Sequence, residues 1–96
     1  MSLFDNVQRF QTLGITTKTI HNGMFQREIY AAMRRFKALD WGDVSDADTE
    51  SNNEAIKNFG MVLGSYNTSE GKIWIIAESN NGHEYDKLTV LFLNEY

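Results

Sequence analysis

The chain has 96 residues, no cysteine and 42% apolar residues, which suffices for one domain with one core and excludes a disulfide framework and a thiolate metal site. Its net charge of −4, from thirteen acidic against nine basic side chains, argues against a sequence-independent grip on nucleic-acid phosphates. The sequence shows neither a signal peptide nor an apolar run long enough to cross a membrane. We expect a single cytoplasmic domain over residues 1–96, with no membrane contact and no direct binding of nucleic acid.

The N-terminal third predicts two short elements. Phe4, Val7 and Phe10 share one side of a helical projection, so residues 4–11 are expected to form an amphipathic helix that ends before Gly14. Residues 15–20 read Ile-Thr-Thr-Lys-Thr-Ile, and such β-branched side chains favour a strand. This segment is therefore a candidate edge strand of a sheet.

The middle third predicts two helices. Between residues 24 and 39, apolar side chains recur at the spacing of one helical face, namely at Phe25, Ile29, Ala32, Met33 and Phe36. A break follows at Asp40-Trp41-Gly42-Asp43. Ser45, with an acid three residues later, is a suitable helix start, because its hydroxyl oxygen can accept a backbone N–H. The second helix is expected over residues 45–58, before Gly60.

The last third changes to an alternating pattern typical of strands. Residues 61–63, 73–76 and 88–93 are expected to be strands, with turns at residues 68–71 and 80–82. Short connections between them predict an antiparallel arrangement. The expected fold is α+β, with two to three helices in the N-terminal two thirds packed on a C-terminal three-stranded antiparallel β-meander. An additional N-terminal edge strand stays an open alternative.

No pattern of residues predicts catalysis or a cofactor. Asp46, Asp48 and Glu50 alternate like the start of a calcium loop, but Ser51 stands where that loop needs glycine and Lys57 where it needs glutamate. The two histidines are far apart in a chain without cysteine, which disfavours zinc. Neither a nucleophile motif nor a phosphate-binding glycine loop is present. We expect a protein that is not an enzyme and has no cofactor, metal or catalytic residue.

Charge is unevenly distributed along the chain. A basic segment, Arg34-Arg35-Phe36-Lys37, resembles a small nucleic-acid patch, although a solvated basic face that pairs with the acids after it is the alternative interpretation. The following residues 40–54 contain no base. They contain only acids among their charged residues: Asp40, Asp43, Asp46, Asp48, Glu50 and Glu54.

Two aromatic features leave alternatives open. In the strand at residues 73–76, the apolar residues Ile73 and Ile75 alternate with the equally apolar Trp74 and Ile76, so both faces of the sheet need cover. Either a three-layer arrangement buries both faces, or one face exposes an apolar patch for a partner. Trp41 could display its ring to a partner, but a large aromatic between two helices is expected to anchor the core.

Several segments resemble a family of short bacterial proteins carried by plasmids, phages and other mobile elements, which are often labelled as the M subunit of a type I restriction endonuclease. The resemblance covers roughly residues 39–96. It rests on Asp-Trp-Gly-Asp at residues 40–43, on Gly-Lys-Ile-Trp-Ile-Ile at residues 71–76 and on the closing Glu-Tyr. The chain differs from the family at Asn94, where proline is expected, and in a longer loop at residues 80–87. The glycine-rich cofactor loop of a methyltransferase is missing, so methylation is not carried over.

The resemblance implies a mobile-element protein that acts on a host protein or nucleoprotein complex, as anti-CRISPR and anti-restriction inhibitors do. Carboxylates can occupy a basic channel in place of nucleic-acid phosphates. The predicted partner-binding residues are the six acids of residues 40–54 together with Tyr66 and Trp74. The alternative is a self-associating adaptor, such as a homodimer, that binds through Tyr66, Trp74 and Ile76 on an apolar sheet face.

Overall fold

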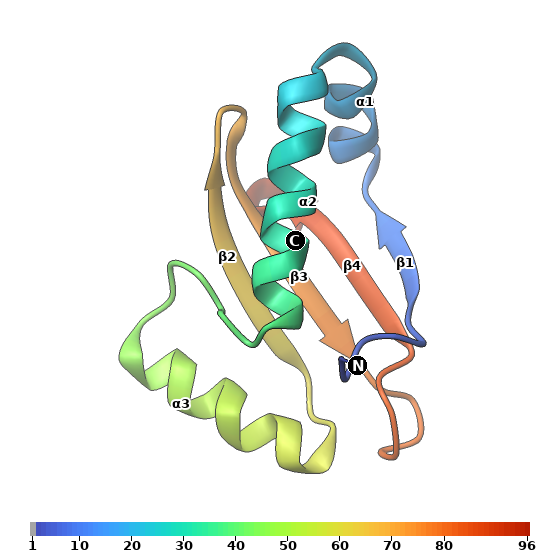
Figure 1. Cartoon of the computed structure of the whole chain (residues 1–96), viewed down its shortest axis with the longest axis vertical. Coiled ribbons are helices and arrows are strands. Elements are labelled where there is room, and N and C mark those ends of the chain that lie inside the picture. Colours follow the sequence, from blue (N-terminus) through green and yellow to red (C-terminus); the bar gives the residue numbers. More distant parts are fainter. Residues whose placement is uncertain (1) are drawn as a thin grey trace.

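The computed structural model describes residues 2–96 and shows an α+β fold in which helices pack on a four-stranded sheet (Figure 1). The helices are α1 (Leu13–His21), α2 (Gly23–Lys37) and α3 (Asp46–Ala55), and two short 3-10 turns are η1 (Ile56–Asn58) and η2 (Leu93–Glu95). The strands are β1 (Gln8–Gln11), β2 (Val62–Thr68), β3 (Gly71–Glu78) and β4 (Lys87–Phe92). The α+β class predicted from the sequence is confirmed.

The sheet has the order β1-β4-β3-β2. Strands β2, β3 and β4 form the predicted antiparallel meander, and β1 adds to it in parallel with β4. In this register Tyr66 lies opposite Ile73, and Trp74 lies opposite Leu91. The sheet is therefore mixed, and its two edges are the N-terminal strand β1 and the strand β2 that follows η1.

The main core lies between the sheet and α2, which crosses in front of β3 in Figure 1. Asn22 caps α2 by accepting the Phe25 backbone N–H at 3.1 Å, and the helix ends before Leu39, whose φ is +65°. Its predicted apolar stripe is buried except for Met33, which is partly exposed. Packing this stripe against alternate residues of β3 and β4 makes α2 the element that the hydrophobic pattern predicts best.

The prediction of a helix over residues 4–11 is wrong. Phe4 is buried with ring centroids 4.8 Å from Phe36 and 5.0 Å from Tyr85, and residues 8–11 pair with β4. A short apolar repeat can satisfy a helix or a strand. Here the segment forms a strand because its backbone pairs with the edge of β4. If the segment were a helix, the backbone N–H and C=O groups on that edge of β4 would be left without partners.

The prediction of an edge strand over residues 15–20 is also wrong, since this segment is the helix α1. Only Ile15 of α1 is buried, while Ile20 is exposed. The β-branched side chains carry a helix cost of less than about 1 kcal/mol each, and burial of Ile15 in the core stabilises the helix against that cost. An N-terminal edge strand does exist, but it is β1, which lies earlier in the chain.

The second predicted helix is confirmed as α3 followed by η1. Ser45 accepts the Asp48 backbone N–H at 3.1 Å, as expected for a helix cap. The turn at residues 68–71 is also confirmed, with Thr68 paired to Gly71 across the β2–β3 hairpin.

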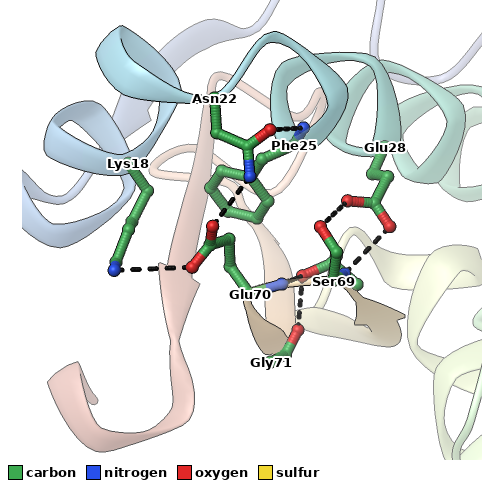
Figure 2. Close-up of polar contacts among 8 residues, drawn as sticks. Lys18, Asn22, Phe25, Glu28, Ser69, Glu70 and Gly71 are labelled. Carbon is green, nitrogen blue, oxygen red and sulfur yellow. Dashed lines mark hydrogen bonds and ion pairs between the residues drawn. The ribbon is translucent and has the colours of Figure 1, made fainter.

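Polar contacts fasten the tip of the β2–β3 hairpin to the helices, as Figure 2 shows. The Glu28 carboxylate on α2 accepts the Ser69 hydroxyl at 2.6 Å and the Ser69 backbone N–H at 2.9 Å. Glu70 accepts the Asn22 side-chain amide at 2.7 Å and lies 3.4 Å from the Lys18 ammonium. These contacts fix the hairpin against the junction of α1 and α2.

The second face of the sheet, defined by Leu63, Trp74, Ile76, Thr89 and Leu91, points away from α2. Ile76 and Leu91 are buried although they lie outside the main core cluster. Tyr96 packs edge to face on Trp74 with a centroid distance of 5.3 Å, yet it is itself 71% exposed. This face is therefore only partly covered. Its aromatic rim, formed by Trp74 and Tyr96, reaches solvent.

Candidate functional site

Asp40 and Tyr66 belong to a network that shapes the turn after α2. The Asp40 carboxylate accepts hydrogen bonds from the Arg35 Nε–H at 2.8 Å and from the Gly42 backbone N–H at 3.1 Å. The Asp40 backbone carbonyl accepts a hydrogen bond from the Tyr66 hydroxyl at 2.7 Å. The hydrogen bond from Arg35, then that from Gly42, lowers the pKa of Asp40. Tyr66 is 2% exposed, and burial raises the pKa of its hydroxyl. The Tyr66 ring therefore supports this turn and has no surface to offer a partner.

The next residues of the turn cover the edge of β2. The Ser65 backbone N–H donates to the Trp41 carbonyl at 2.9 Å, and the Asp43 N–H donates to the Ser65 carbonyl at 2.6 Å. The Asp43 carboxylate lies 2.8 Å from the Lys72 ammonium, and the hydrogen bond from Lys72 lowers the pKa of Asp43. Asp40 and Asp43 are thus partly neutralised by bases of the chain itself, and this segment protects a sheet edge from pairing with other chains.

Asn52, which the sequence interpretation did not single out, positions α3. It is 7% exposed and bonds both backbone groups of Leu63: its amide donates to the Leu63 carbonyl at 2.9 Å, and its oxygen accepts the Leu63 N–H at 3.2 Å. A side-chain amide thereby extends the edge of β2 where a strand would otherwise pair. Because Asn52 faces inward, the helical period places Glu50 and Glu54 on the opposite side of α3.

The remaining predicted acids are exposed on α3, with Asp48 on the side of Asn52 and with Glu50 and Glu54 on the opposite side. Asp46 and Asp48 occupy its first turn, where the helix dipole stabilises negative charge. Glu54 lies 3.0 Å from the Lys57 ammonium. Within residues 2–96, Asp46, Asp48 and Glu50 have no basic side chain within the 4.0 Å of an ion pair. We call Asp46, Asp48, Glu50 and Glu54 the α3 acids.

Charge and aromatic surface meet in one hollow beside α3. A pocket of about 230 Å³ is lined by Asp48, Ser51, Asn52, Leu63 and Trp74. It lies where the middle of α3 borders the second face of the sheet. Two of the predicted partner-binding residues, Asp48 and Trp74, are therefore brought together, although 26 positions in the sequence separate them. A carboxylate beside an indole ring is an arrangement that suits a cationic side chain.

Tyr66 and Trp74, grouped in the sequence interpretation as one apolar contact, lie on opposite faces of the sheet. The register pairs Ser65 with Trp74 and Tyr66 with Ile73, so Tyr66 faces α2 while Trp74 faces the other way. Adjacent residues of a strand point to opposite faces, and the sequence alone did not reveal this register. Of the two rings, only Trp74 borders solvent.

Over residues 2–96, no cluster of three or more His, Asp or Glu side chains is arranged to hold a metal ion. Among these residues there is also no helix with the length and apolar character needed to cross a bilayer. No known protein family, curated protein or solved structure matches the chain.

Proposed function

We propose that this chain is a non-catalytic protein-binding domain whose helix α3 enters a basic channel of its partner, with the pocket between Asp48 and Trp74 on one side of the helix and Glu50 and Glu54 on the other. The main support for this proposal is one pocket lined both by Asp48, which makes no ion pair within residues 2–96, and by the partly exposed Trp74. A lysine or arginine side chain entering it would bond Asp48 and stack on Trp74. Asn52, which also lines the pocket, fixes α3 to the edge of β2 through its two hydrogen bonds with Leu63, so the site is formed before the partner arrives.

The resemblance to proteins of mobile elements suggests which partner would have such a channel. We propose a host nucleic-acid-targeting defence complex, of the kind that anti-CRISPR or anti-restriction proteins inhibit, encountered in the cytoplasm. Such complexes hold nucleic acid in basic channels, and carboxylates on a rigid helix can occupy the same positive potential. Asp46, Asp48 and Glu50 supply negative charge that no basic side chain within residues 2–96 pairs.

Neutralising the α3 acids should abolish partner binding and leave the fold intact. Asp46→Asn, Asp48→Asn, Glu50→Gln and Glu54→Gln, combined in one tagged variant, keep side-chain shape and remove the charge. Affinity capture from host lysate, followed by mass spectrometry, is expected to retain a partner with the wild type at low salt and to lose it with the variant. Exposed charge pairs are screened by salt, so the wild type should also lose the partner at high salt.

A matched pair of double variants controls for net charge. Glu50→Gln with Glu54→Gln removes two charges from α3, whereas Asp5→Asn with Glu84→Gln removes two exposed charges elsewhere. Only the first pair should weaken capture. Retention of the same partner by the quadruple variant would contradict the proposal.

A second candidate function is a self-associating adaptor that uses the second face of the sheet. It is favoured by the aromatic rim of that face, where Phe10 is 42% exposed and Tyr96 extends beyond Trp74. Burial of apolar surface persists or strengthens at high salt. Sedimentation showing a dimer that survives high salt and dissociates on Trp74→Ala would favour this adaptor over the acidic site.

A further inference from the structure

The free edge of the sheet is β1, on the side opposite to α3 in Figure 1. Gln8 donates its backbone N–H to the Asp86 carbonyl at 2.9 Å, and Thr12 donates to the Val90 carbonyl at 3.1 Å. In a parallel pair, only alternate residues of a strand bond the neighbour. The N–H and C=O groups of Arg9 and Gln11 therefore point away from β4, toward the uncovered side of β1.

A groove runs beside this edge, between β1 and α2. One hollow of about 270 Å³ is lined by residues that include Arg9, Gln26 and Tyr30, and a second of about 310 Å³ by Arg9, Tyr30, Arg34 and Lys37 among others. The two hollows share Arg9 and Tyr30 and so adjoin each other. The Arg9 guanidinium lies 5.8 Å from the centre of the Tyr30 ring, where a cation–π contact holds it along the groove.

The groove is basic because its cations have no acidic partner in the described chain. Arg9, Arg34 and Lys37 make no ion pair within residues 2–96, whereas Lys18, Arg35, Lys57 and Lys72 each pair with an acid. In a protein of net charge −4, three unpaired cations around one groove form a local positive surface. The groove and the α3 acids therefore carry opposite charge on opposite sides of the sheet.

We propose that β1 and this groove bind an extended acidic segment of a partner protein, which adds to the sheet as a further strand beside β1. The backbone of the segment would pair with the free groups of Arg9 and Gln11, as in other cases of β-strand addition. Its alternate side chains would point toward α2, where Asp or Glu residues meet Arg9, Arg34 and Lys37. This surface is separate from the α3 acids and does not depend on the function proposed for them.

Nucleic acid is the less favoured occupant of the groove. A single strand could use the three cations and stack a base on Tyr30, but it would leave the outward N–H and C=O groups of β1 without a repeating backbone partner. Only a polypeptide strand satisfies the edge and the charges together. The test must therefore distinguish peptide, nucleic acid and a second copy of this chain.

Selection of displayed random peptides on the immobilised full chain tests the proposal. Enriched peptides should carry Asp or Glu at alternate positions. Their affinity, measured by fluorescence anisotropy, should fall at least about tenfold for the variant Arg9→Gln, Arg34→Gln, Lys37→Gln, because charge-assisted contacts are lost. Gln11→Pro should have a similar effect, since it removes an outward N–H and leaves the bonds to β4 in place. Lys57→Gln, on η1 beyond α3, should bind as the wild type does.

The triple charge variant leaves the backbone of β1 unaltered, so it decides the outcome even if Gln11→Pro impairs folding. Lack of enrichment, or equal peptide affinity for the triple variant, would overturn the proposal. Displacement of the peptides by single-stranded oligothymidylate would overturn it in favour of nucleic acid. A wild-type dimer that the triple variant retains and Gln11→Pro converts to a monomer would show instead that the edge of β1 pairs with a second copy.

Discussion

Replacing Trp41 with alanine should lower the free energy of unfolding by about 3 to 5 kcal/mol, the usual cost of deleting a buried large aromatic side chain. Trp41 is 3% exposed and meets Phe36 edge to face at a centroid distance of 5.3 Å. Its indole N–H donates to the Asn53 side-chain oxygen at 3.0 Å, which ties the turn after α2 to α3. The deletion would leave a cavity at the point where both helices and the edge of β2 meet.

Urea denaturation of the wild type and the variant, followed by circular dichroism, measures this change. Trp74→Ala is the matched control, because it deletes the same side chain from a partly exposed position on the second face of the sheet and should cost less. A loss below about 1 kcal/mol for Trp41→Ala, well under the cost of a buried aromatic, would mean that the ring is displayed to a partner and does not anchor the core.

Gly42→Ala should be among the most damaging single-methyl additions to this chain. Gly42 has a φ of +76°, in the left-handed region, and a Cβ there would collide with the Ser65 carbonyl oxygen and the Tyr66 ring. The left-handed backbone costs a residue with a Cβ about 1 to 2 kcal/mol, and relieving the collision adds about 1 to 3 kcal/mol. The relief must come from moving the turn off β2, which breaks the cover on that edge.

Gly82→Ala separates the two costs. Gly82 has nearly the same φ, +74°, but a Cβ there would have no atom within 4 Å. Thermal or urea unfolding should therefore show a larger loss for Gly42→Ala than for Gly82→Ala, with the difference equal to the cost of the collision. Equal losses would show that the turn is free to move away from β2 and does not seal it.

The fold could be predicted where local pattern and tertiary environment agree. The apolar stripe of α2, the Ser45 cap of α3 and the hairpin turn at residues 68–71 each depend on neighbours in sequence. The N-terminal third depends on distant partners, because β1 forms by pairing with β4 almost eighty residues later. Neither propensity nor periodicity reports such a contact, so strand and helix were interchanged there.

The same distinction applies to the candidate site. The sequence shows directly that residues 40–54 are acidic. It does not show that Asp40 pairs with Arg35 and Asp43 with Lys72. The burial of Asn52 could not be predicted from the sequence, because an asparagine within a polar helix has no pattern that distinguishes it from its exposed neighbours. The pocket that joins Asp48 to Trp74 required the placement of α3 beside β2.

Carboxyl-group footprinting of the captured complex tests most directly whether the α3 acids face the partner. A carbodiimide and glycine ethyl ester label accessible carboxylates, and mass spectrometry compares each residue in the free and bound states. Binding is expected to reduce labelling of Asp46, Asp48, Glu50 and Glu54 and to leave Asp5 and Glu84 unchanged. Unaltered labelling of the α3 acids in a stably formed complex would show that these acids do not face the partner.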